Sequence, residues 1–361
     1  MPTETQLPMR PRLEYIDIAK GIGILLVVMG HNDLSLLSPF LFKLVYSFHM
    51  PLFFFLSGMF FNPATPFLTF VRRRFDSTLK PYIFTVLLIY FATISFSKID
   101  FASATSRVIK AMYANGHYLD WAQLWFLPHL FVVSLFAFVF FKTVYRIGQP
   151  WLRWVLLVFM QVIGVLGLSI FWPFQLNLLG KELTLFGLPF SLDLVLVSGF
   201  FFILGYEANN RLPVSFFEKS RTLIISGLAL VTLIWFLPSA VNLNERQFDS
   251  LIVNTTEALL GIIFVLSLSK QIEQVSQLSA LFQYLGQTSL IILLFQVPIQ
   301  AYWSEKVFAV TNNFPLSYWI AFLAGVIGPI VINVLFIRPN PVLSRWFGHK
   351  PQNIELLSIP K

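Results

Sequence analysis

The sequence predicts an all-α polytopic membrane protein, a bundle of about ten transmembrane helices. Of its 361 residues, 57% are hydrophobic and only 12% are charged. The mean hydropathy of +0.74 excludes a soluble globular domain. The apolar segments are continuous and do not alternate between apolar and polar residues. We therefore expect helices, not strands, to cross the bilayer.

Ten segments hold about the 20 apolar residues that a spanning helix needs. They lie near residues 15–34, 40–62, 81–97, 123–143, 151–172, 188–208, 222–241, 252–269, 281–303 and 317–338. No repeat, low-complexity tract or long linker separates them, so we expect one membrane domain over residues 1–361. The first residues lack the apolar core and cleavage site of a signal peptide, so the segment from Tyr15 is expected to remain as the first helix.

The positions of lysine and arginine predict the orientation. Most of the 25 such residues fall in alternate connections, among them those at residues 63–80, 144–150 and 209–221. Because cytoplasmic loops are enriched in Lys and Arg, both termini are expected in the cytoplasm. The net charge of +8 follows mainly from this topology, and we expect no nucleic-acid partner.

The composition excludes several kinds of chemistry. The chain has no cysteine, which excludes disulfides, thiolate metal sites and a cysteine nucleophile. It also has no Walker loop, HExxH or GxSxG motif and no cluster of metal ligands along the sequence. We therefore expect no metal site.

The first segment carries two ionisable residues, Lys20 and His31. They are eleven positions apart, so they share one face of a helix and lie about 16 Å apart along its axis. Asp17 lies one turn before Lys20 on that face. Such groups inside a membrane are costly and usually face a polar interior. This face can lead to an imidazole that accepts a proton. Alternatively, Asp17 and Lys20 only anchor the helix end and His31 is a hydrogen-bonded core residue. Spacing alone leaves both open.

The second segment carries His49 just ahead of Pro51. A proline frees a carbonyl and bends a helix, often where a cavity is lined. A structural bend with a satisfied histidine is the alternative interpretation. Ser57 and Gly58 follow two turns later and would let another helix approach closely.

A basic patch follows the second segment on the expected cytoplasmic side. It consists of Arg72, Arg73, Arg74 and Lys80. Guanidinium groups suit phosphates, so the patch is a candidate phosphate-binding site. Anionic lipid headgroups are the alternative partner.

Further polar groups lie in later segments. Trp125 and His129, one turn apart in the fourth segment, form either a stacking surface for a sugar or acyl carrier, or an interfacial anchor. Asp193 and Glu257 are intramembrane carboxylates toward the outer side, and Gln296 is the main polar group of the ninth segment.

Several of these motifs together resemble the membrane acyltransferase 3 superfamily, and most closely its fucose 4-O-acetylase type of sugar O-acetyltransferase. The motifs are Asp17-IAKGIGILLVVMG-His31, Ser47-FHMPLFFFLSG-Met59, Arg72-RRFDSTLKPY, Leu124-WFLPHLF and Leu285-GQTSL. The resemblance covers nearly the whole chain. The family's Arg/Lys-x10-His motif falls on Lys20 and His31.

The resemblance implies a ten-helix enzyme of the bacterial inner membrane that uses cytoplasmic acetyl-CoA to acetylate a hydroxyl of a glycan or lipid-linked sugar. It implies that His31 is the catalytic histidine. The chain departs from the family in two places. Many members have an Arg-x-x-Arg pair after the second segment, whereas here Asp76 follows Arg73 by three positions. Relatives also often have histidine where Gln296 stands, which puts a second base there in doubt.

We therefore expect O-acetyl transfer to an envelope or exported polysaccharide, or to its lipid-linked precursor. The expected catalytic residues are Lys20, His31 and His49. The expected donor site is Lys20 with the basic patch, and the expected acceptor site is His49, Trp125, His129 and Asp193. The alternatives are a glycolipid transporter or flippase, which would be expected to show paired, interrupted helices, and a non-catalytic scaffold, which would leave the Lys20–His31 alignment unexplained.

Overall fold

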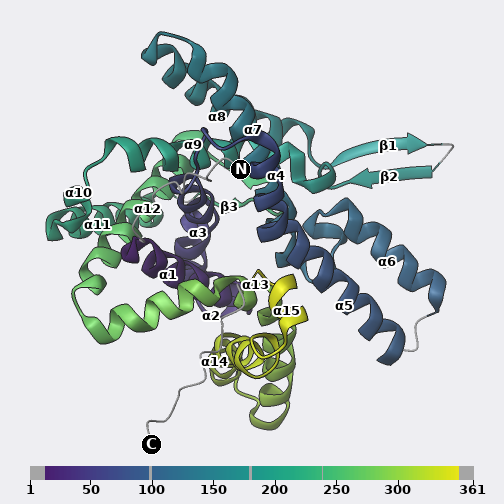
Figure 1. The fold of residues 1–361 in the computed structure, drawn as a ribbon. Helices are drawn as coiled ribbons and strands as arrows, with labels where there is room; N and C mark the ends of the chain where they lie inside the picture. The colour runs from purple at the N-terminus through teal and green to yellow at the C-terminus, as the bar shows by residue number, and fades with distance from the viewer. Residues whose placement is uncertain (1–12, 97–99, 179–180, 238, 349–361) are drawn as a thin grey trace, which may run out of the picture.

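The computed structural model describes residues 13–96, 100–178, 181–237 and 239–348 (Figure 1). The ends of the chain, residues 1–12 and 349–361, lie outside the described residues, so the expected location of the two termini is not addressed. Within these ranges the fold is helical, with two short antiparallel hairpins.

The centre of the bundle is formed by six long helices. They are α1 (Glu14–Gly30), α3 (Pro39–Met59), α7 (Phe126–Thr143), α9 (Val195–Arg211), α12 (Leu251–Glu273) and α13 (Ser276–Thr311). α1 packs against α3, α12 and α13, while α3 also packs against α9 and α12. The two helices with the candidate histidines, α1 and α3, therefore lie side by side near the middle of the bundle (Figure 1).

The remaining helices surround this centre. They are α2 (Leu34–Leu37), α4 (Phe67–Arg74), α5 (Lys80–Phe96), α6 (Phe101–Tyr113), α8 (Pro150–Phe171), α10 (Ser215–Glu218), α11 (Ser220–Phe236), α14 (Phe314–Ile332) and α15 (Pro341–Trp346). A π-helical turn, Phe75–Leu79, joins α4 to α5. The amphipathic helix α6 packs against α5 (Figure 1).

Two hairpins interrupt the helical pattern. β1 (Phe174–Leu178) pairs with β2 (Lys181–Leu185), with Phe174 opposite Leu185. β3 (Val241–Asn242) pairs with β4 (Gln247–Phe248) between α11 and α12. The first hairpin projects from the bundle (Figure 1), whereas the second packs against α3 and α8. A search for long apolar segments misses both, because their strands are short and partly polar.

The predicted fold class is confirmed: this is a polytopic helical membrane protein. Eight helices among the described residues are long and apolar enough to cross a membrane, and Ser220–Phe236 is a shorter apolar helix. The first expected segment corresponds to α1, which has 17 residues and includes Glu14, Asp17 and Lys20. The expected number of about ten spanning helices therefore stays a prediction, because α1 and α11 are shorter than the eight candidates.

Glycines bring the central helices into backbone contact. A Cβ on Gly21 of α1 would overlap the carbonyl oxygen of Phe282, and a Cβ on Gly286 of α13 would overlap that of Asp17. α3 and α9 meet in the same reciprocal way, through Gly58 and Gly205. Small residues permit such close packing of membrane helices. The structure thus confirms the close approach expected at Gly58.

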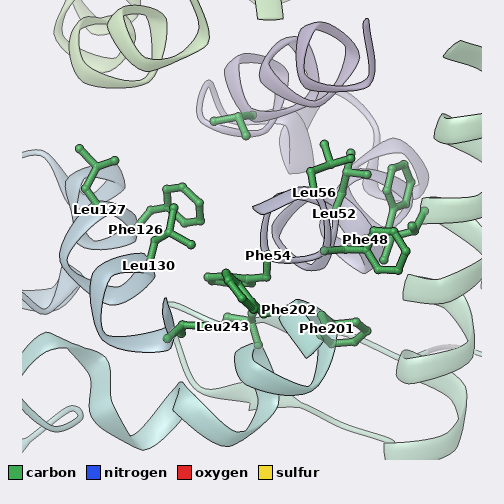
Figure 2. Close-up of a cluster of buried hydrophobic side chains, with 14 of the residues drawn as sticks. Phe48, Leu52, Phe54, Leu56, Phe126, Leu127, Leu130, Phe201, Phe202 and Leu243 are labelled. Atoms are coloured by element: carbon green, nitrogen blue, oxygen red, sulfur yellow. The ribbon is translucent and has the colours of Figure 1, made fainter. Parts of the chain in front are cut away.

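Large side chains fill the space between α3, α7 and α9 (Figure 2). The labelled residues are Phe48, Leu52, Phe54 and Leu56 of α3, Phe126, Leu127 and Leu130 of α7, Phe201 and Phe202 of α9, and Leu243 of the β3–β4 connection. Phe54 and Phe201 are fully buried. Because close packing leaves these side chains little freedom, this cluster holds α3 and α7, which line the cavities described next.

Candidate functional site

A cavity of about 460 Å³ lies between α1, α3, α7 and α13, and we call it the inner cavity. Its lining includes Asp17, Lys20, Ile24, Val27, His31, Met50, Phe53, Leu56, Ser57, Arg74, Ser77, Thr78, Gln123, Trp125, Gly286, Leu290 and Leu293. The cations Lys20 and Arg74 belong to the expected cytoplasmic half, and His31 to the opposite end of α1. The walls between them are largely apolar.

A second cavity, of about 180 Å³, lies on the expected outer side, and we call it the outer cavity. It is lined by His31, Tyr46, His49, Met50, Ala122, Gln123, Trp125, Val241, Asn242, Leu243, Asn244 and Glu245. Its lining is more polar than that of the inner cavity, and five of its members come from one stretch, residues 241–245.

Of the described residues, four line both cavities: His31, Met50, Gln123 and Trp125. They separate a largely apolar chamber that reaches Lys20 from a polar chamber that reaches Glu245. An imidazole at this junction is accessible to a group that enters from either chamber. The structure thus gives His31 the position that a proton acceptor between two substrates would need.

The tautomer of His31 follows from its hydrogen bond. His31 is the C-cap residue that follows α1, and its Nδ1 lies 2.7 Å from the carbonyl oxygen of Val27. A carbonyl oxygen only accepts, so Nδ1 carries the hydrogen and Nε2 of the neutral ring keeps its lone pair. Nε2 is therefore the atom that can take a proton. The hydrogen bond to the core and the role of a base were alternatives at the sequence level, and the structure makes them compatible.

Side chains from three other positions complete the end of α1. Gln300 Nε2 donates to the Val28 carbonyl (3.0 Å), Tyr318 Oη to the Met29 carbonyl (2.9 Å) and Tyr46 Oη to the Gly30 carbonyl (3.3 Å). Together with the bond from His31, each of the last four carbonyls of α1 has a side-chain donor. These carbonyls have no partner within a helix, and in a membrane an unsatisfied one is costly. The bonds fix the end of α1 and with it the position of His31.

His49 repeats the arrangement of His31. Its Nδ1 lies 2.9 Å from the Val45 carbonyl, so Nε2 again keeps the lone pair. It lines the outer cavity, and its ring meets that of Tyr46 edge to face at 4.8 Å. Pro51, two residues on, lies within α3. The expectation that this proline marks a cavity-lining stretch agrees with the positions of His49 and Met50.

Lys20 lies in the inner cavity with its charge partly balanced. Its Nζ is 3.3 Å from Asp17 Oδ1 and 4.5 Å from the centre of the Phe60 ring. The ring face attracts the ammonium group, while the carboxylate orients it. Asp17 and Lys20, which the sequence places one turn apart, are therefore in direct contact.

The basic patch is divided by the structure. Arg74 lines the inner cavity, whereas Arg72 and Arg73 are exposed and lie outside both linings. Lys80 lies 3.8 Å from Asp76 and also lies outside both linings. The π-helical turn after Arg74 adds a residue to the helical repeat, as such turns often do at functional sites. It brings Ser77 and Thr78 into the lining.

The expected acceptor residues fall into two groups. Trp125 lines both cavities, but His129 is fully buried outside them, with Nε2 2.8 Å from Ser198 Oγ and Nδ1 3.2 Å from the Phe190 carbonyl. Asp193 is paired with Arg246 (2.8 Å), and both side chains are almost fully buried. For His129 and Asp193, direct contact with the acceptor is therefore not what the geometry supports; both stabilise the fold around the site.

Sequence reasoning missed Gln123 and residues 241–245. Gln123 lines both cavities, its Nε2 donates to the Leu294 carbonyl (3.5 Å), and its buried Oε1 has no hydrogen-bond partner in the described part of the chain. The signal was a polar residue next to Trp125 at the start of a strongly apolar helix. Gln296, by contrast, lies behind the site and accepts from Gln300 (3.4 Å).

Comparison with known proteins gives one match. The chain matches the acyltransferase domain family over residues 13–338, which covers α1 to α14 and both cavities. No curated protein and no solved structure matches the chain significantly. The match extends over nearly the whole chain and includes every residue that lines the cavities. The protein therefore belongs to the acyltransferase 3 family and is a multi-pass membrane acyltransferase.

Proposed function

We propose that the protein moves an acetyl group from cytoplasmic acetyl-CoA to a hydroxyl of an envelope or exported polysaccharide, or of its lipid-linked precursor, in the bacterial inner membrane. The observation that carries the proposal is that His31 lines both cavities. One imidazole can then face an acyl donor in one chamber and a hydroxyl acceptor in the other.

The inner cavity suits the acyl donor. Ile24, Leu56 and Leu290 give it apolar walls along which a flexible thioester arm can lie. Lys20 and Arg74 supply positive charge toward the expected cytoplasmic side. Its volume of about 460 Å³ suits the arm of coenzyme A better than the whole molecule. The nucleotide phosphates would therefore remain at the mouth, within reach of Arg74 and the exposed Arg72 and Arg73.

The outer cavity suits the acceptor. Trp125 offers an aromatic face to a sugar ring, and His49, Asn242 and Glu245 offer polar groups to its hydroxyls. In this arrangement the acceptor comes from the side opposite to coenzyme A. Acetyl would then cross the membrane at His31 without any movement of the coenzyme across it.

The reaction proceeds by direct transfer. His31 Nε2 accepts the proton of the acceptor hydroxyl as its oxygen attacks the thioester carbonyl carbon. The carbon–sulfur bond then breaks, and the imidazolium returns the proton to the departing thiolate. A positioned general base contributes about 10²–10⁴ in rate. Holding the two substrates together contributes up to roughly 7–11 kcal/mol of the barrier.

The two other mechanisms make different predictions. An acyl-enzyme on His31 would leave acetyl on the protein when the acceptor is absent, and rapid quenching would trap it; direct transfer predicts no such species. For a glycolipid transporter, loss of the His31 base would not abolish acetylation. Membership of an acyltransferase family favours transfer over transport.

The test is the acetyl content of the surface glycan. Cells that depend on this protein would carry either the original chain, His31→Ala or His31→Gln, and the O-acetyl groups would be measured by NMR and mass spectrometry. We expect the rate of acetylation to fall about 10²–10⁴-fold in both variants, which is the contribution of a general base. Equal amounts and equal thermal unfolding of the purified variants would show that the fold is intact. Full acetylation by folded His31→Ala protein would refute the proposal.

A further inference from the structure

The outer cavity has one wall that comes from a single short connection. The two residues of β3, Val241 and Asn242, line it together with Leu243 to Glu245 of the turn that leads to β4. Leu243 is only 2% exposed and belongs to the cluster in Figure 2. The connection is thus anchored in the protein core while its polar residues border the cavity.

Arg246 holds this connection in place. It is a non-glycine residue with φ +58°, and its side chain is 3% exposed. The guanidinium donates to Asp193 through Nε (2.8 Å) and Nη2 (3.3 Å), to Ser191 Oγ (3.2 Å) and to the Asn244 carbonyl (2.6 Å). A buried arginine with this many partners fixes the backbone on either side of it. The wall is therefore preformed before the acceptor arrives.

Two neighbouring loops leave space for this arrangement. A Cβ on Gly187 would overlap the Arg246 guanidinium, and a Cβ on Gly116 would overlap the side-chain amide of Asn244. Gly187 also has φ +143°, which favours glycine, whereas at Gly116 an added Cβ would force the Asn244 side chain to move. The connections that contain Gly116, Gly187 and residues 244–246 therefore meet at one place on the expected outer side. A simple turn between two strands would not need these contacts.

The outer cavity is rich in hydrogen-bond acceptors. Nδ1 of both His31 and His49 is engaged with a backbone carbonyl, so each ring can accept at Nε2. Gln123 Nε2 is engaged with the Leu294 carbonyl, which fixes the amide so that the buried, unpartnered Oε1 is again an acceptor. The carboxylate of Glu245 adds a fourth acceptor.

The charges around the outer cavity also favour a ligand that donates hydrogen bonds. Among the described residues, no lysine or arginine lines the outer cavity, and Glu245 is its acidic member. Glu245 Oε1 accepts from Asn244 Nδ2 (2.8 Å) and Glu245 Oε2 lies 3.5 Å from Nε2 of His117, so both carboxylate oxygens are held in place. A ligand carboxylate or phosphate would meet this negative charge without a cation to bind it.

We propose that residues 241–245 select the acceptor, and that the sugar unit acylated is a neutral or amino sugar that donates hydrogen bonds through hydroxyl or ammonium groups, not a uronic acid or a phosphorylated sugar. In this proposal Glu245 and Gln123 contact the acceptor, and Arg246 and Asp193 are positioning residues. The proposal rests on the proposed function, because it names the acceptor class of that transfer.

The binding test uses three p-nitrophenyl glycosides that differ at one position: a glucoside, a 2-amino-2-deoxyglucoside and a glucuronide. Their binding to the purified full-length protein in nanodiscs would be measured by saturation-transfer NMR without acetyl-CoA. We expect the first two to bind at least tenfold more tightly than the glucuronide. In Glu245→Lys protein we expect the order to reverse toward the glucuronide, and in Glu245→Gln protein we expect the amino sugar to lose its advantage over the glucoside. Stronger binding of the glucuronide to the original chain, an unchanged order in Glu245→Lys, or binding of none of the three would overturn the proposal.

A second measurement separates this proposal from the proposed function. Acetyl-CoA would be added, and acetylated glycoside and free coenzyme A would be measured together. Selective binding without any acetyl transfer would refute the function while leaving the selectivity intact. Transfer to all three glycosides at similar kcat/KM would refute the selectivity while leaving the function intact.

Discussion

Gln300 donates a hydrogen bond from Nε2 to the carbonyl oxygen of Val28, 3.0 Å away and 272 positions earlier in the chain. It ties α13 to the last turn of α1, just before His31. That carbonyl is buried in the membrane domain, so removing its donor would destabilise the end of α1. The residues that line the two cavities would stay the same.

Gln300→Leu tests this tie. The substitution leaves the Val28 carbonyl without its donor, so we expect a loss of about 1–3 kcal/mol in stability and a fall in kcat with little change in the KM for acetyl-CoA. Thermal unfolding in detergent and steady-state kinetics would measure both. Gln271→Ala is the matched control, because Gln271 makes the same kind of bond to the Glu218 carbonyl (2.9 Å) on the exposed side; a surface bond of this kind is expected to matter by less than about 0.5 kcal/mol. Equal effects of the two variants would contradict the role given to Gln300.

Gly286→Ala tests the contact between α1 and α13. The added methyl group would overlap the Asp17 carbonyl oxygen, and overpacking of this kind typically costs about 1–3 kcal/mol. We also expect weaker donor binding, because Gly286 lines the inner cavity next to Lys20. Gly167→Ala in α8 is the control, since a Cβ there meets nothing within 4 Å. Equal unfolding temperatures of the two alanine variants would contradict this prediction, because they would show that α1 and α13 can move apart to accommodate the methyl group.

Arg74→Gln tests the division of the basic patch. Arg74 lines the inner cavity, whereas Arg72 and Arg73 are exposed. We expect Arg74→Gln to raise the KM for acetyl-CoA about tenfold, which corresponds to about 1.4 kcal/mol. Arg72→Gln, with the same change of charge, is expected to have a smaller effect that disappears at high salt. A larger effect at Arg72 would place the phosphate contact outside the cavity.

Arg246→Met tests the anchoring of the outer wall. It would leave the Asp193 carboxylate buried without its partner, and breaking a buried pair in this way costs about 3–5 kcal/mol. The double variant Arg246→Met with Asp193→Leu removes both charges, and we expect it to recover much of the stability but not the selectivity for the acceptor. The unfolding midpoints of the two single variants and the double variant would give the coupling between them. Additive effects would mean that the two side chains act independently.

The sequence predicts the parts of this protein that depend on local composition. Continuous apolar segments are enough to locate the spanning helices, and two ionisable residues on one face of the first helix are enough to single out Lys20 and His31. The wall of the outer cavity was not predictable, because residues 241–245 acquire their role only when α11 and α12 bring them over Trp125. Gln300 and Tyr318 were missed for the same reason: their partners in α1 are more than 270 positions away.

Two of the expected acceptor residues lie outside both cavities, because an isolated polar residue in a membrane segment has two explanations. Asp193 and His129 satisfy the expected pattern of functional residues, but each has found protein partners, Arg246 and Ser198. Arg246 lies in a loop and gives no sign in the sequence that it would be buried. A polar residue in a membrane helix becomes a strong candidate only when its partners are known.

The four side chains shared by the two cavities have a consequence for the cell as a whole. In the proposed arrangement the two chambers face opposite sides of the membrane, and the insulating layer between them is reduced to the thickness of His31, Met50, Gln123 and Trp125. Across that layer the membrane potential acts on every elementary charge with about 2.3 kcal/mol per 100 mV. In that arrangement the bulk of Met50 and Trp125 also serves as electrical insulation, because the partition at which the proposed transfer takes place has to stop protons and ions from dissipating the membrane potential.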